Sequence, residues 1–143
     1  MFNKLNKGDI IGVIAPSSPI MKDDLEKINK SILLMEGSGY NIKFSKNAFK
    51  NTLGYGATPK EKAEDINEMF ADKEVKLIFC VSGGFNSNSV LEYLDYDIIK
   101  NNPKPLCGFS DATSLENIIY EKTGVITFNG PTFKALTSWE TEY

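Results

Sequence analysis

The chain has 143 residues, a length that fits one domain of ordinary size with a real hydrophobic core. Hydrophobic residues make up 41% and charged residues 24%, proportions typical of a folded globular protein rather than a disordered one. The formal net charge is −3 and both signs are interspersed, which argues against nucleic acid or an anionic membrane as a partner.

Several common classes of site are missing from the sequence. Residues 1–7 contain no apolar signal segment and no stretch approaches the length of a membrane span, so we expect a cytoplasmic location. Cys80 and Cys107 each lie in an apolar run and are expected to be free, buried thiols. There is no metal-ligand spacing and no histidine, and we expect no cofactor.

The first half of the chain alternates strand and helix patterns. An apolar run at 9–15 predicts a buried strand that enters a tight loop at 16–19. Helical periodicity predicts a helix over 23–36, and a second strand follows at 41–44. Thr58 and Glu61 form a capping box around Pro59, which marks the start of another helix.

The second half continues the alternation. Residues 75–81 read as a third strand, followed by a glycine loop and a short helix that carries Val90, Leu91 and Leu94. A helical turn at 95–100 precedes the strand that ends at Gly108. The next helix ends near Gly124, and 125–128 reads as a fifth strand.

This alternation predicts an α/β fold: a parallel sheet of about five strands flanked by helices, a Rossmann-like or flavodoxin-like three-layer domain. Ligands of such sheets bind outside the carboxyl ends of the strands. The loops at 16–19, 83–84 and 109–112 all follow strands, so we expect them to meet on one edge.

Ser110 lies where the fourth strand turns into a helix. Gly108 and Ala112, two residues before and after it, are both small, as a nucleophile elbow requires because larger side chains would collide there. Amide groups at the start of the following helix would favour an oxyanion. The alternative is an ordinary helix start, in which Ser110 or Asp111 caps the helix by accepting from Thr113 or Ser114.

The absence of histidine limits what Ser110 can do, because a serine nucleophile normally needs a general base. Ser110 is therefore not a nucleophile, or its base is a lysine or carboxylate, or the base lies on polypeptide outside this chain. Lys104 is a conceivable base, but it lies on the entry side of the strand, away from Ser110.

Gly83 and Gly84 follow the third strand directly. Paired glycines allow close approach of the backbone, and an anion at the next helix is one candidate ligand. Neither a complete phosphate-loop pattern nor a complete dinucleotide pattern is present. A plain turn explains the glycines equally well.

Several segments, in order along the chain, carry a specific resemblance to a known family. They are 7–19, 62–66, 83–88, 94–96, 102–104, the Gly-Phe-Ser-Asp motif at 108–111, 123–124 and 130–131. Together they resemble the amino-terminal half of the LD-carboxypeptidase family of serine peptidases, which includes murein tetrapeptide carboxypeptidases and microcin-immunity peptidases. The Asn-Ser-Asn continuation at 86–88 is more similar to the second group.

The resemblance implies a role for each matched residue. Ser110 would be the nucleophile, and the backbone N–H groups of Asp111 and Gly84 would form the oxyanion hole. Gly83, Phe85, Asn86 and Ser87 would contact the substrate. That substrate would be a cell-wall peptide with an L,D linkage or a peptidyl or aminoacyl nucleotide, and the resemblance also suggests a homodimer.

Two substitutions and one large difference separate the chain from the family pattern. Phe109 replaces the usual tyrosine, and Lys62 stands where the family often has arginine. The family's glutamate and histidine belong to a carboxyl-terminal domain absent from this chain. We therefore expect residues 1–131 to be the nucleophile-bearing domain, residues 132–143 to start a linker, poorly ordered at its end, and the chain alone to be inactive. The alternative is a non-catalytic α/β module that binds a small anion or a nucleotide.

Overall fold

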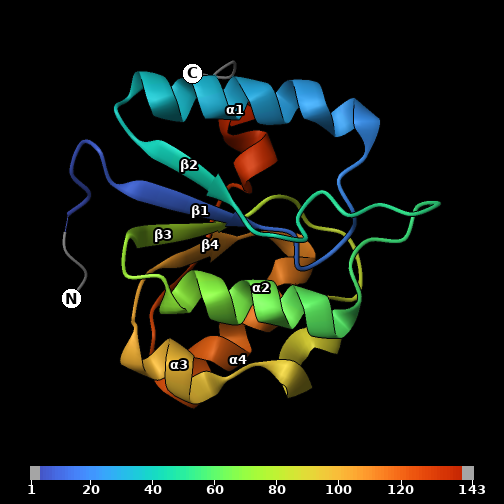
Figure 1. Cartoon of the computed structure of the whole chain (residues 1–143), viewed down its shortest axis with the longest axis vertical. Coiled ribbons are helices and arrows are strands. Elements are labelled where there is room, and N and C mark those ends of the chain that lie inside the picture. Colours follow the sequence, from blue (N-terminus) through green and yellow to red (C-terminus); the bar gives the residue numbers. More distant parts are fainter. Residues whose placement is uncertain (1–3, 140–143) are drawn as a thin grey trace.

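Five parallel strands form one sheet within residues 4–139, the part of the chain described by this computed structural model (Figure 1). Their order across the sheet is β2-β1-β3-β4-β5. The strands are β1 (Ile10–Ile14), β2 (Asn41–Phe44), β3 (Val75–Cys80), β4 (Leu106–Gly108) and β5 (Thr127–Asn129). The predicted α/β class is confirmed, and the strand order is the flavodoxin-like one, in which the order reverses between β1 and β3.

Helices cover both faces of the sheet. One face carries α1 (Leu25–Gly37), preceded by the 3₁₀ turn η1 (Lys22–Asp24), together with the 3₁₀ helix η4 (Phe133–Trp139). The other face carries α2 (Pro59–Ala71), α3 (Tyr96–Asn101) and α4 (Thr113–Thr123) (Figure 1). Each face therefore has its own apolar core, as expected for strands that are buried on both sides.

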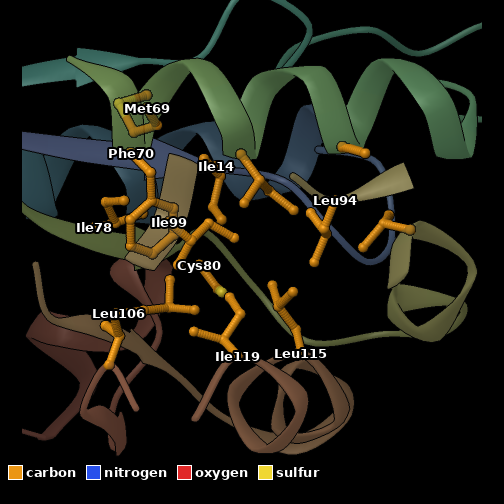
Figure 2. Packing of buried hydrophobic residues seen from close by; sticks show 14 of the residues in the cluster. Ile14, Met69, Phe70, Ile78, Cys80, Leu94, Ile99, Leu106, Leu115 and Ile119 are labelled. Atoms are coloured by element: carbon orange, nitrogen blue, oxygen red, sulfur yellow. The ribbon is translucent and has the colours of Figure 1, made fainter. Parts of the chain in front are cut away.

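The larger core lies between the sheet and α2, α3 and α4 (Figure 2). Phe70 of α2 and Ile119 of α4 are fully buried there against Ile78 and Leu106 of the strands. Cys80 and Cys107 are free and buried, as predicted. Burial raises the pKa of Cys80 well above its usual range and that of Cys107 to about 11, so both thiols stay protonated.

Local sequence signals explain where most elements begin and end. Oγ1 of Thr58 accepts from the N–H of Glu61 at 3.2 Å, and the Glu61 carboxylate accepts from the N–H of Thr58 at 2.9 Å, which confirms the capping box. Gly124 ends α4 in the left-handed conformation, with φ of 72°. Two elements differ from those predicted from the sequence. Residues 87–93 form a 3₁₀ helix, η2 (Ser87–Tyr93), and β5 begins two residues later than predicted.

The segment predicted to be a linker is partly a packed element. Phe133 is fully buried among the rings of Phe44 and Phe79, at centroid distances of 5.9 and 6.0 Å. Lys134 pairs with Asp24 at 2.7 Å, which joins η4 to the start of α1. The packed unit therefore extends beyond residue 131, while the end predicted to be poorly ordered, residues 140–143, lies outside the described residues.

None of the helices in the described range 4–139 is long and apolar enough to cross a membrane.

Candidate active site

Three loops meet at the carboxyl edge of the sheet, as the sequence predicts. They follow β1, β3 and β4, the strands on either side of the point where the strand order reverses. A β-carbon placed on Gly84 would lie 1.9 Å from Oγ of Ser18, and one placed on Gly83 would lie 3.1 Å from Cβ of Ser110. The glycine pair therefore lies between the Ser18 loop and the Ser110 corner.

Ser110 occupies a sharp corner between β4 and α4. Its φ is 61°, in the left-handed region that a residue other than glycine rarely adopts and that costs about 1–3 kcal/mol. A β-carbon on Gly108 would lie 2.8 Å from that of Ala112, so the corner requires a small residue two positions before the serine. The side chain is exposed, and its hydroxyl has no hydrogen-bond partner within residues 4–139.

The helix-capping alternative for this corner does not form. Within residues 4–139 neither the side chain of Ser110 nor that of Asp111 accepts a capping bond from the N–H of Thr113 or Ser114. Instead, Oδ2 of Asp111 accepts from the N–H of Ser87 at 2.9 Å. The Asp111 side chain therefore points back to the loop after β3, and the Ser110 side chain is left free.

Ser87 contacts the Ser110 corner through its backbone N–H and its hydroxyl. Its side chain is fully buried, and its hydroxyl lies 2.6 Å from the carbonyl oxygen of Asp111 and 2.7 Å from Oγ of Ser114. Contact between Ser87 and a substrate stays a prediction, and the contacts that its hydroxyl makes within residues 4–139 are to the Ser110 corner and α4. Phe85 and Asn86, by contrast, are exposed, and Asn86 adopts the left-handed conformation at φ of 72°.

The backbone amides of the glycine pair are free to bind a ligand. Neither Gly83 nor Gly84 donates its N–H to another group within residues 4–139. Gly84 has φ of 138°, a conformation available essentially to glycine alone. The structure thus brings Gly83, Gly84 and Ser110 together, and the N–H of Asp111 directly follows the serine.

A cavity of about 530 Å³ opens beside these loops. Its walls come from residues 17–19 and 54–59, from Phe85, Asn86 and Ser89, and from Lys62. Lys62 donates to the carbonyl oxygen of Ser17 at 2.6 Å. Burial lowers the pKa of Lys62, and the negative charge of Asp111 opposes this shift. Lys62 was not predicted from the sequence to belong to the site. The available signal was its position in the first turn of α2.

Glu116 lies behind the Ser110 corner and was also not predicted from the sequence to belong to the site. It is 3% exposed, and its Oε1 is 2.8 Å from the point where a β-carbon on Gly108 would stand. Burial raises the pKa of this carboxyl, whereas the amide of Asn129 and the nearby N–H of Gly108 lower it. The N–H of Gly108 does not form a hydrogen bond with Oε1 of Glu116, and this oxygen has no hydrogen-bond partner within residues 4–139.

Lys104 lies at the opposite end of β4 from Ser110, as predicted. Its ammonium group donates to the carbonyl oxygens of Met69 and Asp72, at the end of α2. Burial lowers the pKa of Lys104 to about 8, but the strand separates it from the serine. Lys104 therefore supports the fold and cannot act as the base for Ser110.

Known proteins resemble this chain over most of its length. Residues 11–130 match the family model of the LD-carboxypeptidase N-terminal domain. A probable murein peptide carboxypeptidase of Bacillus subtilis is 42% identical over 128 residues, which are 89% of this chain and 39% of that protein. The microcin C7 self-immunity protein MccF of Escherichia coli is 37% identical over 124 residues, 87% of this chain and 36% of that protein.

Solved structures show the same fold. The MccF-like protein of Bacillus anthracis superposes with a TM-score of 0.84 at 39% identity, covering 94% of this chain and 41% of that one. MccF in complex with aspartyl sulfamoyl adenosine superposes at 0.87 with 36% identity, covering 92% of this chain and 39% of that one. A tryptophan-to-phenylalanine mutant of MccF has been solved with adenosine monophosphate, and an active-site mutant in which a serine, an asparagine and a lysine are replaced by alanine has been solved in the apo state.

The chain spans about two fifths of the length of the relatives it matches. The matched region includes the three loops described above and all five strands except the first residue of β1. The chain therefore belongs to the LD-carboxypeptidase family, and residues 11–130 form the family's N-terminal domain.

Proposed function

We propose that this chain provides the nucleophile of a serine-type carboxypeptidase that hydrolyses an amide bond near the carboxyl terminus of a peptide. The observation that carries the proposal is Ser110, exposed at a strained corner against the glycine pair. Corners of this kind present the nucleophile of serine hydrolases above the edge of a sheet. Several curated relatives are named carboxypeptidases, which supports the reaction class.

In the proposed mechanism, Oγ of Ser110 attacks the carbonyl carbon of the scissile amide. The N–H groups of Gly84 and Asp111 hold the negative oxygen of the tetrahedral intermediate. The amine then leaves with a proton, and water hydrolyses the resulting acyl-enzyme. Gly83, Phe85 and Asn86 contact the substrate from the loop after β3.

The base that takes the proton of Ser110 comes from outside this chain. The sequence contains no histidine, and within residues 4–139 the serine hydroxyl bonds to no side chain that could accept its proton. We infer that polypeptide equivalent to the remaining three fifths of the relatives supplies the base, and that the 143-residue chain alone is nearly inactive.

Two substrate classes fit the proposal. The Bacillus subtilis relative is named for murein peptides, and MccF has been solved with aminoacyl sulfamoyl nucleosides. We propose that the active site to which this chain contributes Ser110 acts on small substrates of one of these two kinds, a cell-wall peptide with a terminal L,D linkage or an aminoacyl nucleotide.

A chimera tests the proposal. Residues 1–139 of this chain replace the matched part of the Bacillus subtilis relative, and release of D-alanine from an L,D-linked tetrapeptide and cleavage of aspartyl sulfamoyl adenosine are measured. We expect turnover of one of them, and Ser110→Ala should lower it by about 10³-fold or more. Ser38→Ala, an exposed serine at the end of α1, is the matched control.

A fluorophosphonate probe provides a second measurement on the same chimera. Labelling at Ser110, located by mass spectrometry, is expected. A folded chimera that is neither labelled nor active, or one that keeps full activity with Ser110→Ala, would contradict the proposal.

A non-catalytic anion-binding module is less well supported. The element after the glycine pair is the 3₁₀ helix η2 rather than an α-helix, so its aligned dipoles are few. The first N–H of η2, from Ser87, is already bonded to the Asp111 carboxylate. That negative charge would repel an anion at this position.

A further inference from the structure

The cavity beside the nucleophile has an unusual charge arrangement. It has a volume of about 530 Å³, and Lys62 is the only charged residue that lines it within the described range 4–139. The other lining residues are glycine, alanine, proline, serine, threonine and asparagine residues and two exposed aromatic residues. A ligand that enters this cavity therefore meets a single positive charge.

The ammonium group of Lys62 is half-buried and lacks a close counter-ion. Of its three protons, one is donated to the carbonyl oxygen of Ser17. None of the ion pairs found within residues 4–139 at distances up to 4.0 Å includes Lys62. Asp111 acts on it only at longer range. A partly desolvated cation with unused donors is a site where an anion binds favourably.

The position of this charge relative to the nucleophile follows from a chain of contacts. Lys62 bonds to Ser17, and the neighbouring Ser18 packs against Gly84. The other glycine of the pair, Gly83, lies against Ser110. The cavity and its cation are therefore built on the same loops as the proposed oxyanion hole.

Two rings line the cavity from different loops. Tyr55 is 79% exposed and Phe85 is 78% exposed, values that leave most of each ring available to a ligand. Apolar surface beside a single cation suits a small residue that ends in a carboxylate.

We propose that Lys62 binds the free terminal carboxylate of the substrate in this cavity, next to the bond that Ser110 attacks. The inference rests on the proposed function, because a carboxypeptidase must distinguish a terminal residue from an internal one. The residue released by such an enzyme carries a carboxylate, whereas an internal residue carries a neutral amide. Lys62 would make this distinction.

A purely structural role for Lys62 predicts a different outcome. If its bond to Ser17 only holds the loop after β1 in place, removing the ammonium group would weaken binding of every ligand equally. If Lys62 binds the carboxylate, removal of its ammonium group would weaken the binding only of ligands that carry a carboxylate. The comparison of an acid with its amide therefore separates the two roles.

The test uses the 143-residue chain and two probes, N-acetyl-L-lysyl-D-alanine and its C-terminal amide. Dissociation constants are measured by NMR from the amide signals of Gly83 and Gly84. The original chain should bind the acid about tenfold more tightly than the amide, and Lys62→Met should abolish this preference. Lys62→Arg should keep most of it, because the charge remains.

Lys60→Met is the matched control. Lys60 is exposed, lies two residues away on the same helix and does not line the cavity, so the acid preference should persist. Circular dichroism verifies that each variant is folded. Binding of acid and amide with equal strength, or no binding of the acid at all, would overturn the proposal.

Adenosine monophosphate is a third probe, which tests whether Lys62 binds a phosphoryl group rather than a carboxylate. If binding of this nucleotide depends on Lys62 and the chain shows no preference for the dipeptide acid over its amide, Lys62 binds a phosphoryl group. That result would overturn the assignment of Lys62 to a carboxylate. The chimera keeps the two proposals apart. If it hydrolyses peptides through Ser110 while Lys62→Met keeps the acid preference, the carboxylate site is wrong and the peptidase assignment stands.

Discussion

A β-carbon on Gly84 would lie 1.9 Å from Oγ and 2.6 Å from Cβ of Ser18. The loop after β3 can therefore pack against the loop after β1 only if residue 84 has no side chain. Gly84 also carries one of the two N–H groups that we propose to hold the oxyanion.

Gly84→Ala is expected to lower the free energy of unfolding by about 2 kcal/mol or more, because the new methyl group overlaps Ser18 and φ of 138° disfavours alanine. Urea denaturation followed by circular dichroism measures the change. Gly37→Ala is the control, since a β-carbon there meets nothing within 4 Å at the end of α1. Equal effects of the two substitutions would show that the contact with Ser18 is unimportant.

Ser87→Ala is expected to destabilise the chain by about 1–3 kcal/mol, because it removes a buried hydroxyl that lies within hydrogen-bond distance of both Asp111 and Ser114. In the chimera it should also lower activity, since the corner that holds Ser110 loses its brace. Ser38→Ala removes a hydroxyl at an exposed position, where it bonds to Leu34, and should change stability by less than about 0.5 kcal/mol. A stable, fully active Ser87→Ala chimera would contradict the bracing role.

Short sequence patterns were sufficient to predict most of the fold. Apolar runs and helical periodicity predicted the alternation of strands and helices, and the capping box at Thr58 fixed the start of α2 because its bonds are local. The corner at Ser110 was predictable for a related reason: the small residues at 108 and 112 are needed by the turn itself. The convergence of the three loops then follows from parallel strand topology.

Features that depend on tertiary contacts were not predictable. Ser87 is polar and follows a glycine loop, so its sequence suggests exposure, but its partners come from α4 and the corner before it. Lys62 lines a cavity whose other walls come from three separate segments. Phe133 shares the tail at 132–143 with two other aromatic residues, Trp139 and Tyr143, and no periodicity in this tail indicates that Phe133 is buried.

Phe133→Ala tests whether η4 is part of the folded unit. The ring is fully buried and packs edge-on against Phe44, so its removal leaves a cavity that should cost about 3–5 kcal/mol in unfolding free energy. Phe128→Ala is the control, because that ring in β5 is 50% exposed. A loss of less than about 1 kcal/mol with Phe133→Ala would mean that the domain is stable without η4.

Glu116→Gln tests the buried carboxyl behind the Ser110 corner. Burial raises the pKa of Glu116 in the folded chain above its ordinary value of 4.5. Between these two values the folded state holds a proton that the unfolded state has already released. Stability from this group is therefore complete below about pH 4.5 and is lost as the pH rises through the folded pKa.

A glutamine keeps the shape of the side chain without the charge. Glu116→Gln should therefore make the chain more stable than the original at about pH 7, and the difference should vanish as the pH falls below about 4.5. Urea denaturation at both pH values measures this change, with the exposed Glu121→Gln on the same helix as the control. A gain in stability that is the same at both pH values would show that burial of the charge at Glu116 is not its cause.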